Sequence, residues 1–129
     1  MTSLERLPAI EGAYILLLED DALISIDSEE MLLSLGASRV LVAHTLAEAE
    51  AIVARERVDA AVLDLLIGRE RSDAFAARLL ARPIPVVFAS GFADSTSLPE
   101  ALRGVPMVDK PYTGRSLMAA LGAAIDRLG

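Results

Sequence analysis

Five short apolar runs are spaced along the chain, and each is predicted to be a strand covered on both faces. The runs are continuous, mostly aliphatic or β-branched, and occupy residues 14–18, 40–43, 58–63, 84–89 and 105–108. Strands of a parallel sheet have this pattern because helices cover both faces, whereas half-exposed strands alternate apolar and polar residues. The pattern therefore predicts a parallel sheet of five strands.

Helix signals occupy the segments between these runs. Gly36 suits the position after a helix over residues 22–35, where a left-handed backbone conformation is common. Thr45 and Glu48 have the spacing of a capping box, which predicts a helix from there to about Arg57. Each of these helices connects two consecutive strands.

The second half of the chain continues the alternation. A third helix, over about residues 71–82, is predicted to end before Pro83. A fourth has Pro99 as its first residue, with few residues left before Gly104, and a fifth follows Thr113. Five strand–helix units in a row predict an α/β fold, a flavodoxin-like doubly wound parallel sheet of order 2-1-3-4-5 with five helices.

The length of 129 residues suits one domain with a single substantial core. Residues 12–129 are predicted to form this domain. Residues 1–11 precede the first strand and are expected to be a loosely attached N-terminal extension.

Composition narrows the classes of function. Cysteine is absent, which excludes disulfides and thiolate metal sites. The net charge is -7, and no cluster of Lys or Arg offers a surface for nucleic acid. No apolar run is long enough to cross a bilayer, and the first residues lack the layout of a signal peptide. We therefore expect a cytoplasmic protein without nucleic-acid or membrane partners.

Polar residues stand where the predicted strands end. Glu19 and Asp20 follow the first strand, Asp64 the third and Ser90 the fourth, while Lys110, the only lysine, follows the fifth. The carboxyl ends of parallel strands meet at one edge, and in this strand order the functional crevice lies there, between strands 1 and 3. The sequence therefore predicts a site at that edge.

The expected site is rich in negative charge. Carboxylates from strands 1 and 3 repel one another, and protonation or a bound cation relieves the repulsion. Oxygen ligands without His or Cys suit Mg²⁺, so we expect Mg²⁺ at this edge, helped by Lys110. An alternative for the run Glu19 to Asp21 is that these acids only begin a helix, where they favour its dipole. Asp64, a lone acid ending a buried strand, is harder to explain in that way.

These motifs resemble those of a known family, the receiver domains of bacterial response regulators. Four stretches carry the resemblance, in the family's order and at the ends of the predicted strands, and together they cover the chain from about residue 12 to its end. They are LLLEDD (16–21), AAVLDLLIG (60–68), VVFASG (86–91) and VDKPY (108–112).

The resemblance implies a phosphoacceptor site. Asp64 would be the nucleophile that takes a phosphoryl group from a histidine kinase, and Ser90 and Lys110 would complete the catalytic set. Mg²⁺ would be held by Glu19, Asp20, Asp64 and the backbone carbonyl of Leu66. Pro111 would follow a cis peptide bond, as it often does in this family.

Several positions depart from the family's common pattern. Met107 stands where many receivers have the aromatic residue that moves with the Ser/Thr hydroxyl. The stretch VVFASGFAD is similar to the Phe-Ala-Thr-Gly-x-Tyr signature of an alphaproteobacterial subgroup, with Ser90 for Thr and Ala93 for Tyr. Phe92 is then a candidate moving aromatic, or it only packs under the loop. Gly68 is expected to supply the turn after Asp64.

His44 is the only histidine of the chain. It follows the second predicted strand, away from the crevice between strands 1 and 3. We interpret it as a solvated loop residue, and a phosphohistidine role is the alternative.

The resemblance implies a single-domain response regulator that switches partner binding. No segment follows the fifth predicted helix, so output is expected through a protein contact or through phosphate traffic. The expected partners are a histidine kinase or phosphotransfer protein and a downstream protein on the face of helix 4, strand 5 and helix 5, where Tyr112 could lie. The chain is expected to be a monomer or weak dimer.

As a receiver the chain would catalyse its own phosphorylation, with self-dephosphorylation as an accompanying activity, without being a metabolic enzyme.

Two alternatives belong to other classes of protein. A small Mg²⁺-dependent phosphohydrolase of the haloacid dehalogenase type would use Asp64 as well, but Leu66 stands where such enzymes generally carry a second Asp. A pseudo-receiver that binds partners without phosphorylation would be expected to lack one of the site residues.

Overall fold

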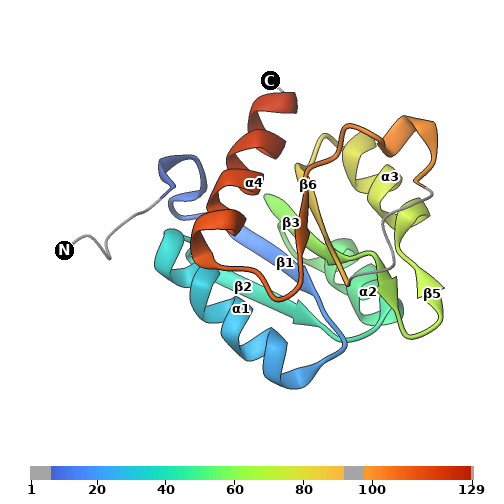
Figure 1. Ribbon diagram of the computed structural model, residues 1–129, viewed down its shortest axis with the longest axis horizontal. Helices are drawn as coiled ribbons and strands as arrows, with labels where there is room; N and C mark the ends of the chain where they lie inside the picture. The colour runs from blue at the N-terminus through green and yellow to red at the C-terminus, as the bar shows by residue number, and fades with distance from the viewer. Residues whose placement is uncertain (1–6, 92–97, 129) are drawn as a thin grey trace.

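A five-stranded parallel sheet forms the centre of the computed structural model, which describes residues 7–91 and 98–128 (Figure 1). The strand order is β2-β1-β3-β6-β7, and every neighbouring pair is parallel. The predicted order 2-1-3-4-5 is therefore confirmed, because β6 and β7 are the fourth and fifth strands of this sheet. The five strands are β1 (Tyr14–Leu18), β2 (Arg39–Ala43), β3 (Ala60–Asp64), β6 (Val86–Ser90) and β7 (Met107–Asp109).

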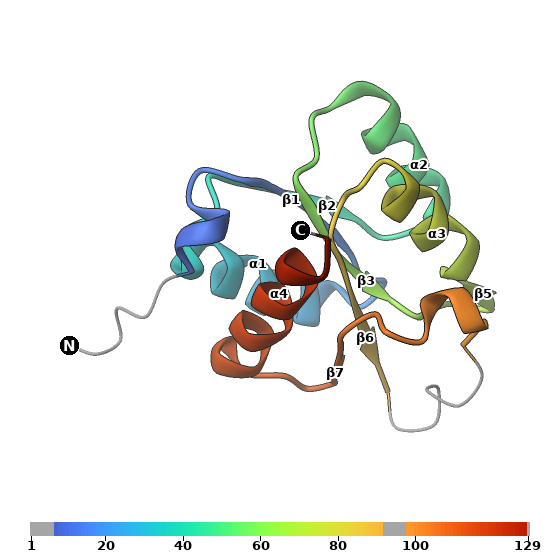
Figure 2. The same ribbon diagram turned by 90° about the horizontal axis from the view of Figure 1, so that it is seen from above.

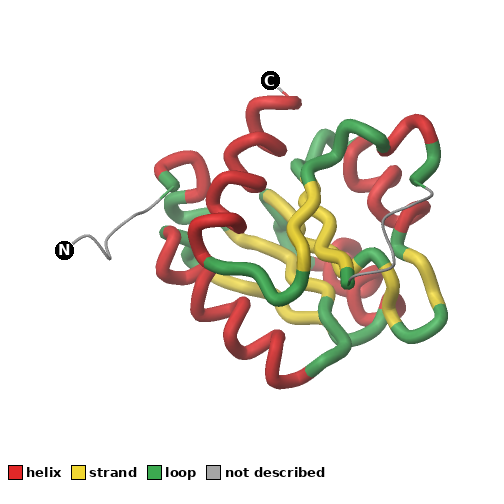
Figure 3. Tube along the Cα trace, viewed as in Figure 1, coloured by secondary structure: helices red, strands yellow, loops and turns green. Residues whose placement is uncertain are grey.

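Two pairs of helices cover the two faces of the sheet. Helices α1 (Ala22–Leu35) and α4 (Gly114–Leu128) lie on one face, and α2 (Leu46–Arg55) and α3 (Asp73–Ala81) lie on the other, as Figure 2 shows. The strands thus form a middle layer between two helical layers (Figure 3). No helix within the described parts of the chain is long and apolar enough to cross a membrane.

Alternation along the strands divides the core into two halves. In β1, Ile15 and Leu17 pack with α1 and α4, whereas Leu16 and Leu18 pack with α2 and α3. All four side chains are almost completely buried, as are all five residues of β3. A strand buried on both faces needs apolar residues at every position, which explains the continuous runs in the sequence.

The predicted helix ends are confirmed at two places. Gly36 follows α1 with a φ of 126°, and its N–H donates to the carbonyl oxygens of Leu32 and Leu33. The Thr45 hydroxyl accepts the N–H of Glu48 at 3.1 Å, as in a capping box. The Glu48 carboxylate, however, accepts the N–H of His44 at 2.7 Å instead of that of Thr45.

The predicted fourth helix is wrong for the residues that the structure describes. Pro99 precedes a single 3-10 turn, η3 (Glu100–Leu102), in place of an α-helix. Only a few residues separate Pro99 from Gly104, too few for several turns of α-helix. The described chain therefore has four α-helices where five were predicted.

A small hairpin was not predicted. Strands β4 (Leu66–Ile67) and β5 (Glu70–Arg71) pair antiparallel directly after β3. Gly68 lies in the turn with a φ of 60°, a conformation that glycine adopts without strain. The expectation that Gly68 supplies the turn after Asp64 is thus confirmed.

Residues 7–11, the part of the predicted extension that the structure describes, pack against the domain and are not loosely attached. The short 3-10 helix η2 (Pro8–Ile10) buries Ile10 among core residues of the α1–α4 face. The N–H of Leu7 donates to the carbonyl of Leu35 at 2.9 Å, and that of Gly12 to Gly36 at 3.0 Å. The segment is held because it covers the C-terminal end of α1.

Candidate functional site

The carboxyl ends of the strands bring five predicted site residues to one edge of the sheet: Glu19, Asp20, Asp64, Ser90 and Lys110. The strand register pairs Leu18 with Leu63 and Asp64 with Ala89, so the residues following β1 lie level with the end of β3. Ser90 pairs in turn with Asp109, the residue before Lys110. Residues far apart in the sequence therefore meet because their strands end together.

Lys110 is the cation of the site. Its Nζ lies 2.9 Å from Oδ2 of Asp64 and 3.2 and 3.4 Å from the two carboxylate oxygens of Glu19. Both acids are almost completely buried, at 1% exposure for Glu19 and 3% for Asp64. The lysine joins the ends of β1 and β3 across the crevice, where the sequence predicted it.

The three consecutive acids after β1 do different things. Glu19 accepts a hydrogen bond from the N–H of Asp21 as well as from Lys110. Asp20 is exposed, and its Oδ2 accepts the N–H of Gly68 at 3.2 Å. Asp21 alone caps α1, accepting from the N–H groups of Leu23 and Ile24. The alternative in which all three acids only begin the helix is therefore wrong for Glu19 and Asp20.

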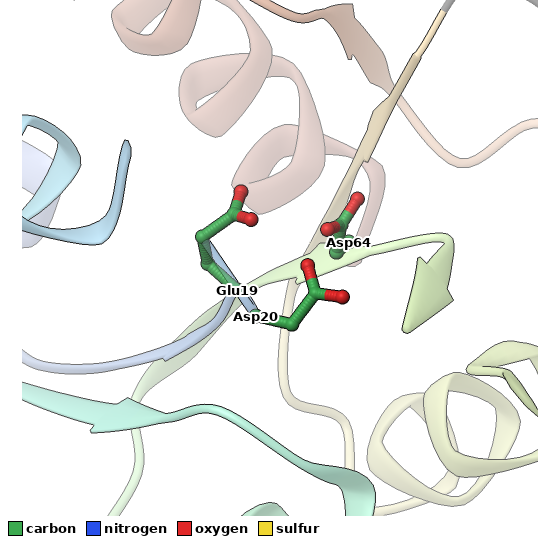
Figure 4. Close-up of side chains that lie close together, drawn as sticks. All are labelled: Glu19, Asp20 and Asp64. Atoms are coloured by element: carbon green, nitrogen blue, oxygen red, sulfur yellow. The ribbon is translucent and has the colours of Figure 1, made fainter. Parts of the chain in front are cut away.

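The three acids closest to the crevice have the spacing of a cation site. One carboxylate oxygen from each of Glu19, Asp20 and Asp64 lies within 4.8 Å of the others, and Figure 4 shows the side chains gathered at the ends of β1 and β3. One lysine cannot balance three carboxylates, and the donor set of hard oxygens is that of Mg²⁺. The residues present therefore fit this ion.

The buried position of Asp64 and the excess of negative charge around it affect its pKa. Burial raises the pKa of Asp64 to about 7. The hydrogen bond from Lys110 opposes this rise, whereas the nearby charges of Glu19 and Asp20 add to it. The same contacts raise the pKa of Lys110, because Asp64 and Glu19 outweigh the effect of its burial. Lys110 is therefore firmly charged, and Asp64 is easily protonated without a further cation.

Ser90 is buried at the end of β6, and its hydroxyl donates to a sulfur atom. The Ser90 Oγ to Met107 Sδ distance is 3.4 Å. The main-chain oxygen of Ser90 accepts the N–H of Lys110 at 2.9 Å. Ser90 thus lies between the lysine and Met107, which lines a groove of about 650 Å³ formed by β7 and α4.

Two other predictions concern residues near Lys110. The Lys110–Pro111 peptide bond is cis, as the resemblance implied. Tyr112 is buried with its hydroxyl 2.7 Å from that of Ser28, and it lines the same groove as Met107. Burial raises the pKa of Tyr112. Phe92 lies outside the described residues.

Sequence reasoning missed Ser72. Its hydroxyl is completely buried and donates to the carbonyl oxygen of Asp64 at 2.8 Å, while its N–H donates to that of Leu65 at 3.0 Å. These bonds fix the chain directly after β3 and therefore the direction of the Asp64 side chain. The predicted helix over about residues 71–82 included Ser72, whereas α3 begins at Asp73, so the position of the serine just before the helix was not recognised.

His44 is an exposed residue of the loop after β2, as predicted, but it also makes a contact that was not predicted. Its ring Nδ1 lies 3.0 Å from the main-chain oxygen of Glu19. Strand β2 is the direct neighbour of β1, so the residue after β2 reaches the residue after β1. The sequence argument considered only the gap between β1 and β3.

Leu66 begins β4, two residues past Asp64, and its side chain is partly exposed at the rim. This position suits the carbonyl role that the resemblance implied.

Comparisons with known structures identify the family. SdrG from Sphingomonas melonis Fr1 is 36% identical, with a TM-score of 0.76, over 97% of this chain and 99% of its own. A BeF3-activated conformation of SdrG from Pseudomonas melonis Fr1 is 38% identical, with a TM-score of 0.71, over 88% of this chain and 96% of its own.

A response regulator receiver protein from Sinorhizobium medicae WSM419 is 25% identical, with a TM-score of 0.73, over 92% of this chain and 98% of its own. A comparison with protein-family models gave no match, and neither did a comparison with curated proteins. The fold is the flavodoxin-like receiver fold, with an acidic cluster at the carboxyl ends of its strands. The chain belongs to the receiver domains of response regulators.

Proposed function

We propose that this receiver accepts a phosphoryl group from a histidine kinase on Asp64, in a Mg²⁺-dependent reaction, and thereby switches partner binding. The observation that carries the proposal is the convergence of Asp64, Lys110 and two further acids at the switch point of the sheet. Three carboxylates around one ammonium group leave an excess of negative charge, and burying Asp64 among them lowers the stability of the fold unless a cation binds. Such a cluster is therefore better explained by function than by stability.

The metal would be held by carboxylate oxygens of Glu19, Asp20 and Asp64, with the carbonyl of Leu66 as the further ligand from the chain. Bound Mg²⁺ would offset the negative charge of the carboxylates and of the phosphoryl oxygens. The spacing of the three carboxylates supports this assignment.

Each of the chain's own groups at the site would have a role in the transfer step. A carboxylate oxygen of Asp64 forms a bond to phosphorus as the P–N bond of the phosphohistidine breaks, and the electron pair of that bond leaves with the imidazole nitrogen. Lys110, fixed by Glu19, holds the other Asp64 oxygen and stabilises the charge on the transferred group. Ser72 keeps the backbone of Asp64 in place during the step.

The switch would run through Ser90 and Met107. The hydroxyl that now donates to Met107 would turn to a phosphoryl oxygen, which is the stronger acceptor. Met107 would lose its partner and could then reorient in the groove that it lines. Phe92 remains a second candidate for the moving residue, and membership of the Phe-Ala-Thr-Gly-x-Tyr subgroup remains a prediction.

The groove formed by β7 and α4 would be the surface where partner binding changes. The upstream partner would be a histidine kinase or phosphotransfer protein, and the downstream protein would dock on the face of β7 and α4, which includes Tyr112. A net charge of -7 disfavours nucleic acid and anionic membranes as partners. We propose a monomer or weak dimer in the cytoplasm.

Labelling by a small phosphodonor tests the proposal. The unmutated protein with acetyl phosphate and Mg²⁺ should gain the mass of one phosphoryl group, and Asp64→Asn or removal of the metal with a chelator should prevent this. Lys110→Ala should prevent it as well. Arg57→Ala serves as the control, because Arg57 is an exposed residue that pairs with Asp59 at the opposite, amino end of β3. Peptide mapping should place the label on Asp64.

The other outcomes separate the alternative functions. Continuous turnover of a phosphomonoester, abolished by Asp64→Asn, would support the phosphohydrolase. A folded protein that takes up no label from any donor in Mg²⁺ would support the pseudo-receiver. We propose that the chain is not a metabolic enzyme. We therefore expect phosphoryl labelling of Asp64 and no continuous turnover of a phosphomonoester.

A further inference from the structure

The imidazole of His44 contacts the backbone that carries two of the candidate metal ligands. Its Nδ1 is 3.0 Å from the main-chain oxygen of Glu19. Because a carbonyl oxygen can only accept a hydrogen bond, Nδ1 carries the hydrogen and donates. This fixes the tautomer of the neutral ring and leaves Nε2 without a hydrogen.

Both backbone polar groups of Glu19 are therefore bound by the end of β2. The N–H of Glu19 donates to the carbonyl of Ala43 at 3.0 Å, and its carbonyl accepts from the next residue, His44. His44 is held in its turn by helix α2, since its own N–H donates to the Glu48 carboxylate at 2.7 Å. A continuous set of hydrogen bonds thus runs from the first turn of α2 to the residue before Asp20.

This contact matters most for Asp20. The carbonyl of Glu19 and the N–H of Asp20 belong to one planar peptide unit, so a hydrogen bond that fixes the plane also fixes the direction in which Asp20 leaves the chain. The carboxylate of Glu19 is held independently by Lys110 and by the N–H of Asp21. Asp20 is exposed, and the contact of its carboxylate with Gly68 is long at 3.2 Å.

We propose that His44 is a positioning residue of the metal site, which orients the Glu19–Asp20 peptide so that the Asp20 carboxylate meets those of Glu19 and Asp64. The inference rests on the proposed function because it assumes that the three acids bind Mg²⁺. In this proposal the imidazole acts through the Glu19–Asp20 peptide and is not a ligand of the ion.

Two substitutions at position 44 isolate the hydrogen bond from the side chain's bulk. His44→Leu removes the donor. His44→Asn keeps an N–H donor, because its amide nitrogen is as many bonds from Cα as Nδ1 of histidine. Thr45→Ala is the matched control, since it removes the cap of α2 next to His44 but leaves the imidazole contact intact. It should lower the stability of the protein through loss of the cap.

Mg²⁺ affinity, measured by calorimetric titration of the full chain, is the first readout. His44→Leu should weaken binding about 2- to 10-fold, the range expected for loss of one neutral hydrogen bond. His44→Asn should stay within about twofold of the unmutated protein, and Thr45→Ala should bind normally despite its lower stability. Labelling by acetyl phosphate should show the same split, with a higher Mg²⁺ requirement and an unchanged rate at saturating Mg²⁺.

An unchanged Mg²⁺ affinity in His44→Leu would overturn the inference about His44 but not the proposed function, since the unmutated protein would still bind Mg²⁺. Equal losses in His44→Leu and Thr45→Ala would also overturn it, because they would indicate general destabilisation. A failure of the unmutated protein to bind Mg²⁺ would overturn the proposed function instead. If His44→Leu does not fold, the imidazole ¹⁵N shifts of the metal-free protein decide: hydrogen on Nδ1 supports the contact, and hydrogen on Nε2 alone overturns it.

Discussion

Asp64 owes its properties to its neighbours more than to its own chemistry. A carboxyl group in water is a weak base and a poor nucleophile, and burial makes the ionised form more costly still. Lys110 offsets part of that cost, and the charges of Glu19 and Asp20 act in the other direction. The ionised form of Asp64 is therefore only partly stabilised, and a bound cation would stabilise it further.

The pH dependence of stability should report this imbalance. The pKa of Asp64 in the folded protein, about 7, lies above its ordinary value of 3.8, so the folded state holds the proton more tightly than the unfolded state. The resulting stabilisation is present below the unfolded pKa and is lost as the pH rises through the folded pKa. Without metal, Asp64→Asn should therefore exceed the unmutated protein in stability at about pH 8, by on the order of 1 to 2 kcal/mol.

Urea unfolding at about pH 5 and pH 8 measures the difference. The advantage of Asp64→Asn should shrink at the lower pH, where the unmutated carboxyl is protonated. Taking the difference between two proteins cancels the opposite contribution of Asp59, whose pKa is lowered. An advantage of equal size at both pH values would contradict the assignment.

Met107 offers a second test at the scale of one residue. Met107→Leu keeps the volume but removes the sulfur that accepts the Ser90 hydroxyl. Because that hydrogen bond must break before Ser90 can turn, the variant should bind the phosphoryl mimic BeF3⁻ about 2- to 5-fold more tightly. Calorimetric titration in Mg²⁺ measures the change, and Ser90→Ala, which lacks the hydroxyl altogether, should bind more weakly.

Helix α1 buries polar residues and exposes apolar ones, in contrast to the usual pattern of an amphipathic helix. Ser25 and Ser28 are buried on its inner face, while Leu23 and Ile26 are 76% and 54% exposed. The buried hydroxyls are satisfied, since Ser25 donates to the carbonyl of Ala22 and Ser28 pairs with Tyr112. Both faces of the helix therefore mix apolar and polar residues, and its inward side could not be predicted from the sequence.

The pair of Ser28 and Tyr112 connects α1 to the loop after Lys110, and its strength can be measured. Ser28→Ala leaves the tyrosine hydroxyl buried without this partner, which should cost about 1 to 3 kcal/mol of stability. Adding Tyr112→Phe to Ser28→Ala should recover part of the loss, because no unpaired hydroxyl remains. Urea unfolding of the two single variants and the double variant completes the cycle, and strictly additive effects would show that the pair is not coupled.

At the scale of the whole molecule, the sequence predicted those features that depend on strand order. Continuous apolar runs identified all five strands of the sheet, and strand order then placed Glu19, Asp64 and Lys110 at one edge. Contacts made by a backbone group to a distant side chain left no sequence pattern. The bonds of Ser72 to Asp64 and of His44 to Glu19 depend on the path of the chain between elements.

The errors in the prediction have the same physical origin. A fourth helix was predicted because alternation implied one, whereas only a 3-10 turn forms between Pro99 and Gly104. The attachment of residues 7–12 was missed because it depends on the burial of Ile10, the packing of Leu7 and backbone hydrogen bonds to the end of α1. Neither feature changes the periodicity of the sequence.

The metal should stabilise the entire fold. A ligand that binds only the folded state adds about 2.7 kcal/mol when its concentration is 100 times its dissociation constant. Thermal unfolding of the unmutated protein should therefore shift upward with Mg²⁺, and the shift should be much smaller in Asp20→Asn. An equal shift in both proteins would indicate that the ion binds elsewhere.

The anchoring of residues 7–12 has a practical consequence for such measurements. This segment is bonded to the end of α1 beside the start of β1, whereas the acids lie at the opposite, carboxyl ends of the strands. A fluorophore or surface tether joined ahead of Leu7 would sit away from the crevice. Kinase docking and phosphate chemistry could then be followed on an immobilised protein with its reactive edge facing solution.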